Sequence, residues 1–172
     1  MKSILSPKRL AALSVLTALS LISFLIENLI PSPFFLGARL GIANVFVTLV
    51  VVWYSLPEAL IVLVAKLLLS AAFVGVGQLL YAAPAGLVSL VVTFVLVRTL
   101  SKSLSIVAVN ALSAVAHNLT QLLVFALVTN SNAWYLAPYL TIVGLTAGVL
   151  TGSAVYFTVK ILPSKLLGRE KE

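Results

Sequence analysis

The polar residues best suited to do chemistry lie on one expected helix in the second half of the chain. Asn110, His117 and Gln121 are spaced seven and four residues apart, and Asn118 lies beside them. At about 100° of rotation per residue, this spacing places the first three within a wedge of about 40°. Amides and imidazole both donate and accept hydrogen bonds. The stripe is therefore either a ligand-binding surface or a hydrogen-bond network inside the protein.

Lys66 is unusual because it lies in the middle of an apolar segment. It is nine residues into a helix expected to start at Pro57, which corresponds to about 13 Å at 1.5 Å per residue. We expect neither Glu27 nor Glu58 at the same depth. The Lys66 side chain is therefore neutral, held by amides and carbonyl groups, or in contact with an anionic ligand.

A second group of polar residues surrounds Arg39, which follows a segment broken by Pro31 and Pro33. Arg39 either forms an ion pair with Glu27 or, together with Asn44, forms the rim of an outward-facing pocket. The guanidinium group can bind phosphate or carboxylate through two parallel hydrogen bonds. The second alternative therefore predicts an anionic ligand.

The composition excludes several kinds of catalytic site. The chain of 172 residues has no cysteine and one histidine, and it contains no aspartate. Thiol chemistry is excluded, and one imidazole is too few for the usual zinc or iron site. The phosphate-binding motif Gly-x-x-x-x-Gly-Lys-Ser/Thr is also absent, so the chain does not hydrolyse ATP by that mechanism. We expect a protein that is not an enzyme, with no catalytic residue, metal or cofactor.

The hydropathy predicts a single all-α transmembrane domain over residues 1–172. Hydrophobic residues make up 62% of the chain and charged residues only 9%, against about 25% charged in soluble domains. A bilayer span needs about 20 apolar residues. We expect an integral membrane six-helix bundle, with an uncleaved first segment and helices at about 10–26, 38–54, 57–74, 85–97, 104–128 and 133–161.

The distribution of basic residues predicts the topology. Nine of the eleven Lys and Arg residues flank apolar segments on the side of the two termini: Lys2, Lys8, Arg9, Arg98, Lys102, Lys160, Lys165, Arg169 and Lys171. This asymmetry indicates cytoplasmic N and C termini in a multi-pass protein of the inner (cytoplasmic) membrane. It also explains the net charge of +7 without a nucleic-acid partner.

Small residues at four-residue spacing predict close helix packing. Glycines have this spacing at Gly37 and Gly41 and at Gly144, Gly148 and Gly152. For the glycines we favour packing inside the bundle. Ser14 and Ala18 form a similar edge on the first helix, which faces either a neighbouring helix or another subunit.

Three runs of residues resemble a bacterial membrane family labelled Gx transporter or heptaprenyl diphosphate synthase component I. The runs are Glu27-Asn28-Leu29-Ile30-Pro31, Gly37-Ala38-Arg39-Leu40-Gly41-Ile42-Ala43-Asn44 and Ala116-His117-Asn118-Leu119-Thr120-Gln121-Leu122. The resemblance covers nearly the whole chain.

That family is similar to the substrate-binding S components of energy-coupling factor (ECF) vitamin transporters, which are six-helix bundles that bind small molecules near the outer face. The resemblance implies that an Ala-x-x-x-Ala edge on the first helix docks on a membrane coupling subunit driven by two ATPase subunits. Ser14 and Ala18 would form this edge here, with one departure from the pattern. The resemblance also implies a link to flavins or isoprenoid quinones.

We therefore expect a membrane subunit that captures a small anionic or amphipathic molecule from outside, for import driven by partner ATPases. The candidate binding residues are Arg39, Asn44, Lys66, His117, Asn118 and Gln121. One alternative is a noncatalytic membrane component of isoprenoid quinone synthesis or electron transfer. Polyprenyl synthases hold magnesium diphosphate with Asp-rich motifs, which this chain lacks. A purely structural scaffold is the other alternative.

Overall fold

The computed structural model of the protein describes residues 7–29, 41–100 and 103–162, and helices are the only regular elements in these ranges. The elements, in chain order, are α1 (Pro7–Leu29), α2 (Ile42–Trp53), α3 (Leu56–Val74), the 3-10 turn η2 (Val76–Gln78), α4 (Leu79–Thr99), α5 (Ile106–Thr129), the 3-10 turn η3 (Trp134–Leu136) and α6 (Ala137–Ile161). The predicted all-α class is confirmed.

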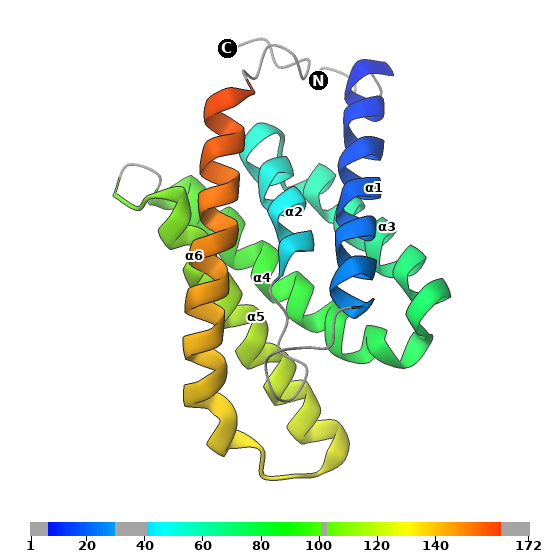
Figure 1. Ribbon diagram of the computed structural model, residues 1–172, viewed down its shortest axis with the longest axis vertical. Helices are drawn as coiled ribbons and strands as arrows, with labels where there is room; N and C mark the ends of the chain where they lie inside the picture. The colour runs from blue at the N-terminus through cyan, green and yellow to red at the C-terminus, as the bar shows by residue number, and fades with distance from the viewer. Residues whose placement is uncertain (1–6, 30–40, 101–102, 163–172) are drawn as a thin grey trace.

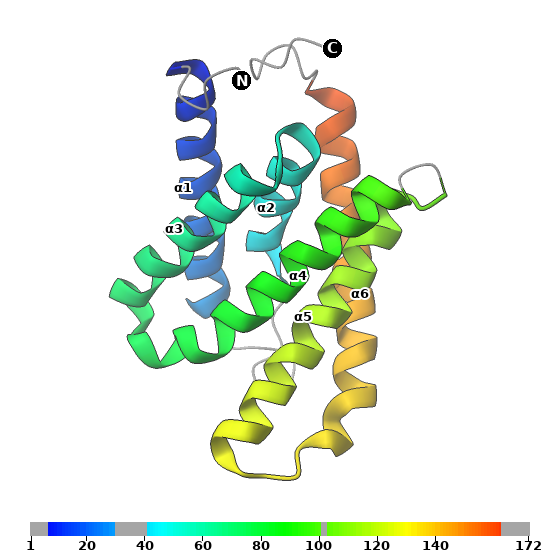
Figure 2. The same cartoon turned by 180° about the vertical axis from the view of Figure 1, so that it is seen from behind.

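The helices form one bundle in which α1 begins and α6 ends at the same end, called here the terminal end (Figure 1). Helices α3 and α4 run obliquely to α1 and α6, which is clearest from behind (Figure 2). The paired α5 and α6 extend beyond the far end of α1 in both views.

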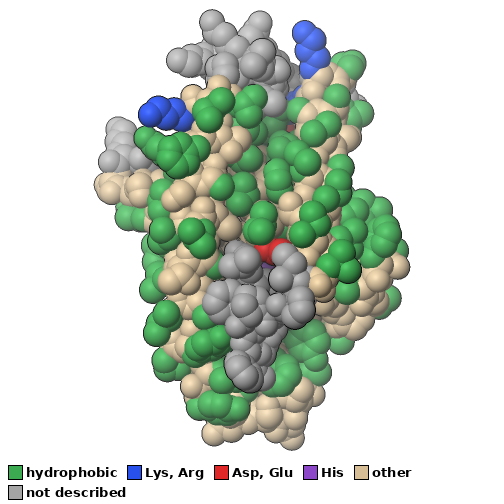
Figure 3. Space-filling view, viewed as in Figure 1, with side chains coloured by type: hydrophobic (Ala, Val, Ile, Leu, Met, Phe, Trp, Pro, Cys, Tyr) green, Lys and Arg blue, Asp and Glu red, His purple; other side chains and the backbone are tan. Residues whose placement is uncertain are grey.

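Five helical segments are long and apolar enough to cross a membrane, as a multi-pass membrane protein requires. They contain α1, α3, α4, α5 and α6. Figure 3 shows one face that is largely hydrophobic, with basic side chains toward the terminal end. The cytoplasmic location of that end stays a prediction.

The second helix departs from the sequence prediction. It was expected over residues 38–54, but within the described residues α2 starts at Ile42 and contains 12 residues, which is about 18 Å long and short for a bilayer span of about 30 Å. Gly41 precedes it with φ of +71°, a left-handed conformation that favours glycine. Gly41 therefore starts α2 and does not form a packing step inside a helix. Gly37 lies outside the described residues.

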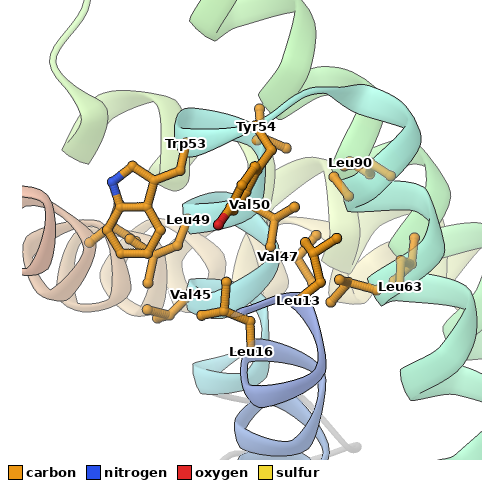
Figure 4. Close-up of a cluster of buried hydrophobic side chains, with 14 of the residues drawn as sticks. Leu13, Leu16, Val45, Val47, Leu49, Val50, Trp53, Tyr54, Leu63 and Leu90 are labelled. Carbon is orange, nitrogen blue, oxygen red and sulfur yellow. The ribbon is translucent and has the colours of Figure 1, made fainter. Parts of the chain in front are cut away.

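Helix α2 is the centre of the bundle. Apolar side chains surround it, and two thirds of its residues are buried. Figure 4 shows Val45, Val47, Leu49 and Val50 of α2 among leucines of the neighbouring helices: Leu13 and Leu16 of α1, Leu63 of α3 and Leu90 of α4. A helix that is apolar on all sides belongs inside a bundle, not on its surface.

The fourth helix begins earlier than predicted. The sequence placed Pro84 in a loop and started the helix at Ala85, whereas α4 starts at Leu79 and contains Pro84 in its second turn. Pro84 has no N–H to donate to the Leu80 carbonyl, so α4 lacks one backbone hydrogen bond there, and the helix nevertheless continues to Thr99. The other predicted helices agree with the structure to within four residues at either end.

The glycines of α6 pack against α5, as predicted. Cβ atoms at Gly144, Gly148 and Gly152 would lie 3.0, 2.4 and 2.8 Å from the nearest Cα atoms of α5, those of Val115, Ala111 and Val107 respectively. Without side chains at these positions, the two backbones approach closely and gain van der Waals contact along several turns.

An ion pair joins the first and third helices at the terminal end. Arg9 donates a hydrogen bond to the carboxylate of Glu58, which also accepts from the Ser55 hydroxyl. The Arg9 guanidinium lies 5.1 Å from the ring centre of Tyr54. Glu58 is only 2% exposed, so this pair satisfies a buried charge and holds α1 against the start of α3.

Replacing Gly148 with alanine tests the tight pairing of α5 and α6. The added methyl group would overlap Ala111, and such overpacking costs about 1–3 kcal/mol. We expect Gly148→Ala to lower the free energy of unfolding by this amount, measured by reversible unfolding in detergent micelles. Gly77→Ala is the control because its added Cβ has open space. Equal stability of the two variants would contradict the assignment.

Removing the Arg9 side chain tests the ion pair. In Arg9→Met the buried Glu58 carboxylate loses its cation, which should lower the free energy of unfolding by about 3 kcal/mol. The adjacent, exposed Lys8 provides the control, and Lys8→Met should change stability by less than about 0.5 kcal/mol. If Arg9→Met is as stable as Lys8→Met, the pair does not hold the helices together.

Candidate functional site

A polar cavity lies among the helices beside the start of α2. It has a volume of about 40 Å³, enough for a water molecule or two. Apolar and small side chains form part of its wall, and six polar or charged residues of α1, α2, α3 and α5 line it: Glu27, Asn44, Lys66, His117, Asn118 and Gln121. The structure thus brings together five of the six predicted binding residues. The sixth, Arg39, lies outside the described residues.

Lys66 points into the bundle because it lies on the buried face of α3. The buried residues Val62, Leu63 and Leu67 flank it at helical spacing, so its side chain shares their orientation. Lys66 is 5% exposed, and its Nζ lies 3.4 Å from Oδ1 of Asn44. This distance exceeds the usual 2.7–3.2 Å of an N–H···O bond, so the contact with Asn44 is weak.

Glu27 lies at the amino-terminal end of α2. Its Oε1 accepts a hydrogen bond of 2.7 Å from the backbone N–H of Ile42. A carboxylate at this position satisfies a free N–H group and interacts favourably with the positive end of the helix dipole. Ser20 makes a second connection between the two helices by donating to the Ala43 carbonyl at 2.8 Å. These bonds fix α2, and with it Asn44, relative to α1.

Glu27 and Lys66 line the same cavity, which corrects the expectation that no acid lies near the depth of Lys66. That expectation compared the positions of the residues along their helices, which locate the backbone and not the ends of long side chains. Helix α3 is also oblique to α1 (Figures 1 and 2), so positions along the two helices do not give a common depth. The cavity therefore contains one acidic and one basic side chain.

The predicted stripe on α5 is divided between two environments. His117 and Gln121 line the cavity together with Ala114, whereas Asn110 is not part of the lining. Asn110 instead accepts a hydrogen bond of 3.1 Å from the Thr48 hydroxyl and donates one of 3.0 Å to the Ile106 carbonyl. The reason is distance along the helix: seven residues are about 10 Å, which carries Asn110 past the cavity to the core of α2.

Asn118 lines the cavity and also joins α5 to α6. Its Nδ2 donates to the Leu140 carbonyl at 3.2 Å. The amide therefore has a structural role on one side and a cavity-lining role on the other. Nδ1 of His117 is buried, so the ring is held within the bundle.

Sequence reasoning missed the apolar wall of the cavity and a buried hydroxyl cluster. Phe24, Leu63 and Gly86 help to line the cavity. Elsewhere, the Ser113 hydroxyl donates to the Ser89 carbonyl at 2.8 Å and contacts Thr93. Leu63 lies three residues before Lys66, so helical periodicity could have assigned it to the same face. Ser89 and Thr93, four residues apart, offered a similar signal.

The chemistry available in the cavity is recognition of charge and hydrogen-bonding groups. One amine, one carboxyl group, three amides and one imidazole surround it. The residues that the structure describes contain no group of three or more His, Asp or Glu side chains that could hold a metal ion.

Comparison with protein families identifies the type of membrane protein. Residues 16–158, most of the chain, match the family model described as heptaprenyl diphosphate synthase component I. The chain belongs to this family. All six polar residues of the cavity lie within the matched region, as does Ala18, whereas Ser14 precedes it. No curated protein and no solved structure matches the chain significantly.

The two small residues predicted to dock a partner lie on the outside of the bundle. Ser14 and Ala18 are both exposed on α1, one helical turn apart. Leu13 and Leu16, on the opposite side of the helix, are buried against α2 and α3. The edge is therefore accessible to another protein within the membrane.

Proposed function

We propose that this protein is a membrane substrate-binding subunit, similar to an ECF S component, that captures a small anionic or amphipathic molecule from outside. The observation that carries the proposal is the cavity: polar side chains from four helices, among them Glu27 and the only buried lysine of the described residues, line one space inside a largely apolar bundle. Ionisable groups inside a membrane are costly, and they commonly mark a ligand pathway.

The cavity residues favour a ligand with an anionic group. Lys66 supplies a positive charge that can pair with a ligand carboxylate or phosphate. His117, Asn118 and Gln121 on the facing helix supply hydrogen bonds. Arg39 is proposed to form the outer rim of the same site. The Glu27 carboxylate disfavours a ligand anion immediately beside it, which orients the ligand toward Lys66.

The size of the cavity implies that binding requires movement. Ligand pockets typically have volumes of about 300–1,000 Å³, and this cavity has about 40 Å³. A molecule the size of a vitamin, a flavin or an isoprenoid head group therefore enters only when the surrounding helices separate. The structure represents the closed, ligand-free state in this proposal.

The energy for import comes from partner subunits in this proposal. The sequence has no phosphate-binding loop, so a membrane coupling subunit with ATPase subunits would supply the energy. Ser14 and Ala18 form the proposed docking edge because both are small and exposed on α1. Small residues let two helices approach closely in a lipid environment.

The family description supports a second candidate function. It names one component of a synthase that makes a polyprenyl diphosphate. The protein would then be a noncatalytic membrane component of isoprenoid quinone synthesis, or of flavin- or quinone-linked electron transfer, with the cavity holding the polar head of a quinone or flavin. The chain has no aspartate with which to form the Asp-rich magnesium sites of polyprenyl synthases.

Substitutions on one helix separate ligand binding from packing. Gln121→Ala removes a cavity amide, and we expect it to weaken ligand binding about ten-fold, the effect of losing one buried hydrogen bond to a charged group. Asn110→Ala removes an amide that bonds only to protein groups among its described contacts, so it should lower thermal stability and leave affinity unchanged. Titrations with flavins, vitamin carboxylates, prenyl phosphates and quinones measure affinity, and thermal unfolding of the same variants measures stability.

Three results of these titrations would count against import. Saturable binding of quinones alone would favour the second function. No binding of any compound, combined with loss of stability in both variants, would indicate a structural scaffold. Equal loss of affinity in both variants would show that the cavity does not define the site.

Enlarging the small residues of α1 tests the docking edge. We expect Ala18→Leu to prevent copurification of the ATPase subunits from native membranes, because the added side chain separates the two helices. Ala72→Leu is the matched control, since Ala72 is exposed on α3. Ser14→Ala keeps the edge small and should preserve the complex. A complex that survives Ala18→Leu, or that is lost equally in Ala72→Leu, would contradict docking through this edge.

A further inference from the structure

A second cavity lies near the terminal end of the bundle, and none of the described residues that line it also lines the polar cavity. Its volume is about 350 Å³, much larger than that of the polar cavity. Residues of α2, α4, α5, α6 and the segment before α5 line it: Val52, Val97, Leu104, Ile106, Val109, Tyr156, Val159 and Lys160.

The lining of this cavity is suited to a hydrocarbon chain. Valine, leucine and isoleucine form its wall, and among the described residues that line it the side-chain polar groups are the Tyr156 hydroxyl and the Lys160 ammonium. Both residues are exposed and lie at the rim. The space is partly open to the outside of the bundle, and its almost entirely apolar wall favours contact with hydrocarbon over contact with water. An apolar molecule is therefore the expected occupant.

The charge at the rim indicates the head group of that occupant. Lys160 lies in the last turn of α6, at the same end as Arg98 in the last turn of α4 and Lys8 near the start of α1. Basic residues at the end of membrane helices lie at the level of the lipid head groups. An ammonium group at the mouth of an apolar cavity at this level matches a molecule with a phosphate above a hydrocarbon chain.

We propose that this cavity binds one acyl chain of an anionic phospholipid, with the lipid phosphate paired to Lys160. The acyl chain fills the space lined by α2, α4, α5 and α6. The bound lipid thereby stabilises the terminal end of the bundle independently of any ligand in the polar cavity. The site is distinct from the proposed substrate site, and neither proposal depends on the other.

Lipid titration of the delipidated protein tests this site. Phosphatidylglycerol in mixed micelles should raise the unfolding temperature and remain bound as one molecule per chain in native mass spectrometry. Phosphatidylcholine, which has no net charge, should bind at least about five-fold more weakly, the effect of one charge pair near the membrane surface. Lys160→Gln should remove this preference. Arg98→Gln is the matched control, because Arg98 is exposed at the same end and is absent from the cavity lining.

Filling the cavity provides the second arm of the test. Val159→Phe should abolish lipid retention by occupying the chain site, and the smaller change Val97→Leu should weaken retention if Val159→Phe does not fold. Equal binding of the two lipids by the unaltered protein would overturn the proposal. It would also be overturned by retention that these substitutions leave unchanged, or by preferential retention of an added polyprenyl phosphate over phosphatidylglycerol.

Discussion

The absence of water from the hydrocarbon core is the constraint on which this structure depends. Every buried polar group must find a partner inside the protein. The backbone meets this requirement by forming helices, and hydroxyls such as those of Thr120 and Thr141 bond to carbonyl groups one turn earlier. Ionisable side chains lie inside the bundle in two places. Glu58 pairs with Arg9 at the terminal end, and Glu27 and Lys66 line the polar cavity. The first place joins α1 to α3, and the second is the proposed ligand site.

The two cavities divide the molecule into regions with different chemistry. The polar cavity is small, enclosed by six helices and lined by groups that recognise charge, whereas the apolar cavity is larger and carries its charge only at the rim. Close packing of α5 on α6 through glycines lies between these regions. Helix α5, which is closely packed on α6, carries His117, Asn118 and Gln121. In the proposed mechanism the helices on the opposite wall of the cavity would therefore move to admit a ligand. Helix α1 is the natural candidate, because it packs on α2 and α3 and bears the proposed docking edge.

The sequence was sufficient to predict the helical class, most helix positions, the glycine contacts and five residues that meet in one cavity. These features follow from hydropathy and helical periodicity, which are local properties. The short α2, the helical position of Pro84 and the shared cavity of Glu27 and Lys66 could not be predicted in this way, because they depend on helix tilt and on which helix occupies the centre. Asn110 is a further example. It lies on the same face of α5 as His117, but it is two turns nearer the start of the helix, where it contacts Thr48 and not the cavity.

The central claim is that the polar cavity binds a small molecule. The most direct test is mass spectrometry of the compounds that the protein releases when it is denatured after purification from its native membrane. A Lys66→Gln variant is prepared and measured in the same way. The account predicts one non-lipid compound with an anionic group, present at near one molecule per chain in the unaltered protein and depleted in the variant. The same compounds in equal amounts from both proteins, or membrane lipids alone from both, would contradict it.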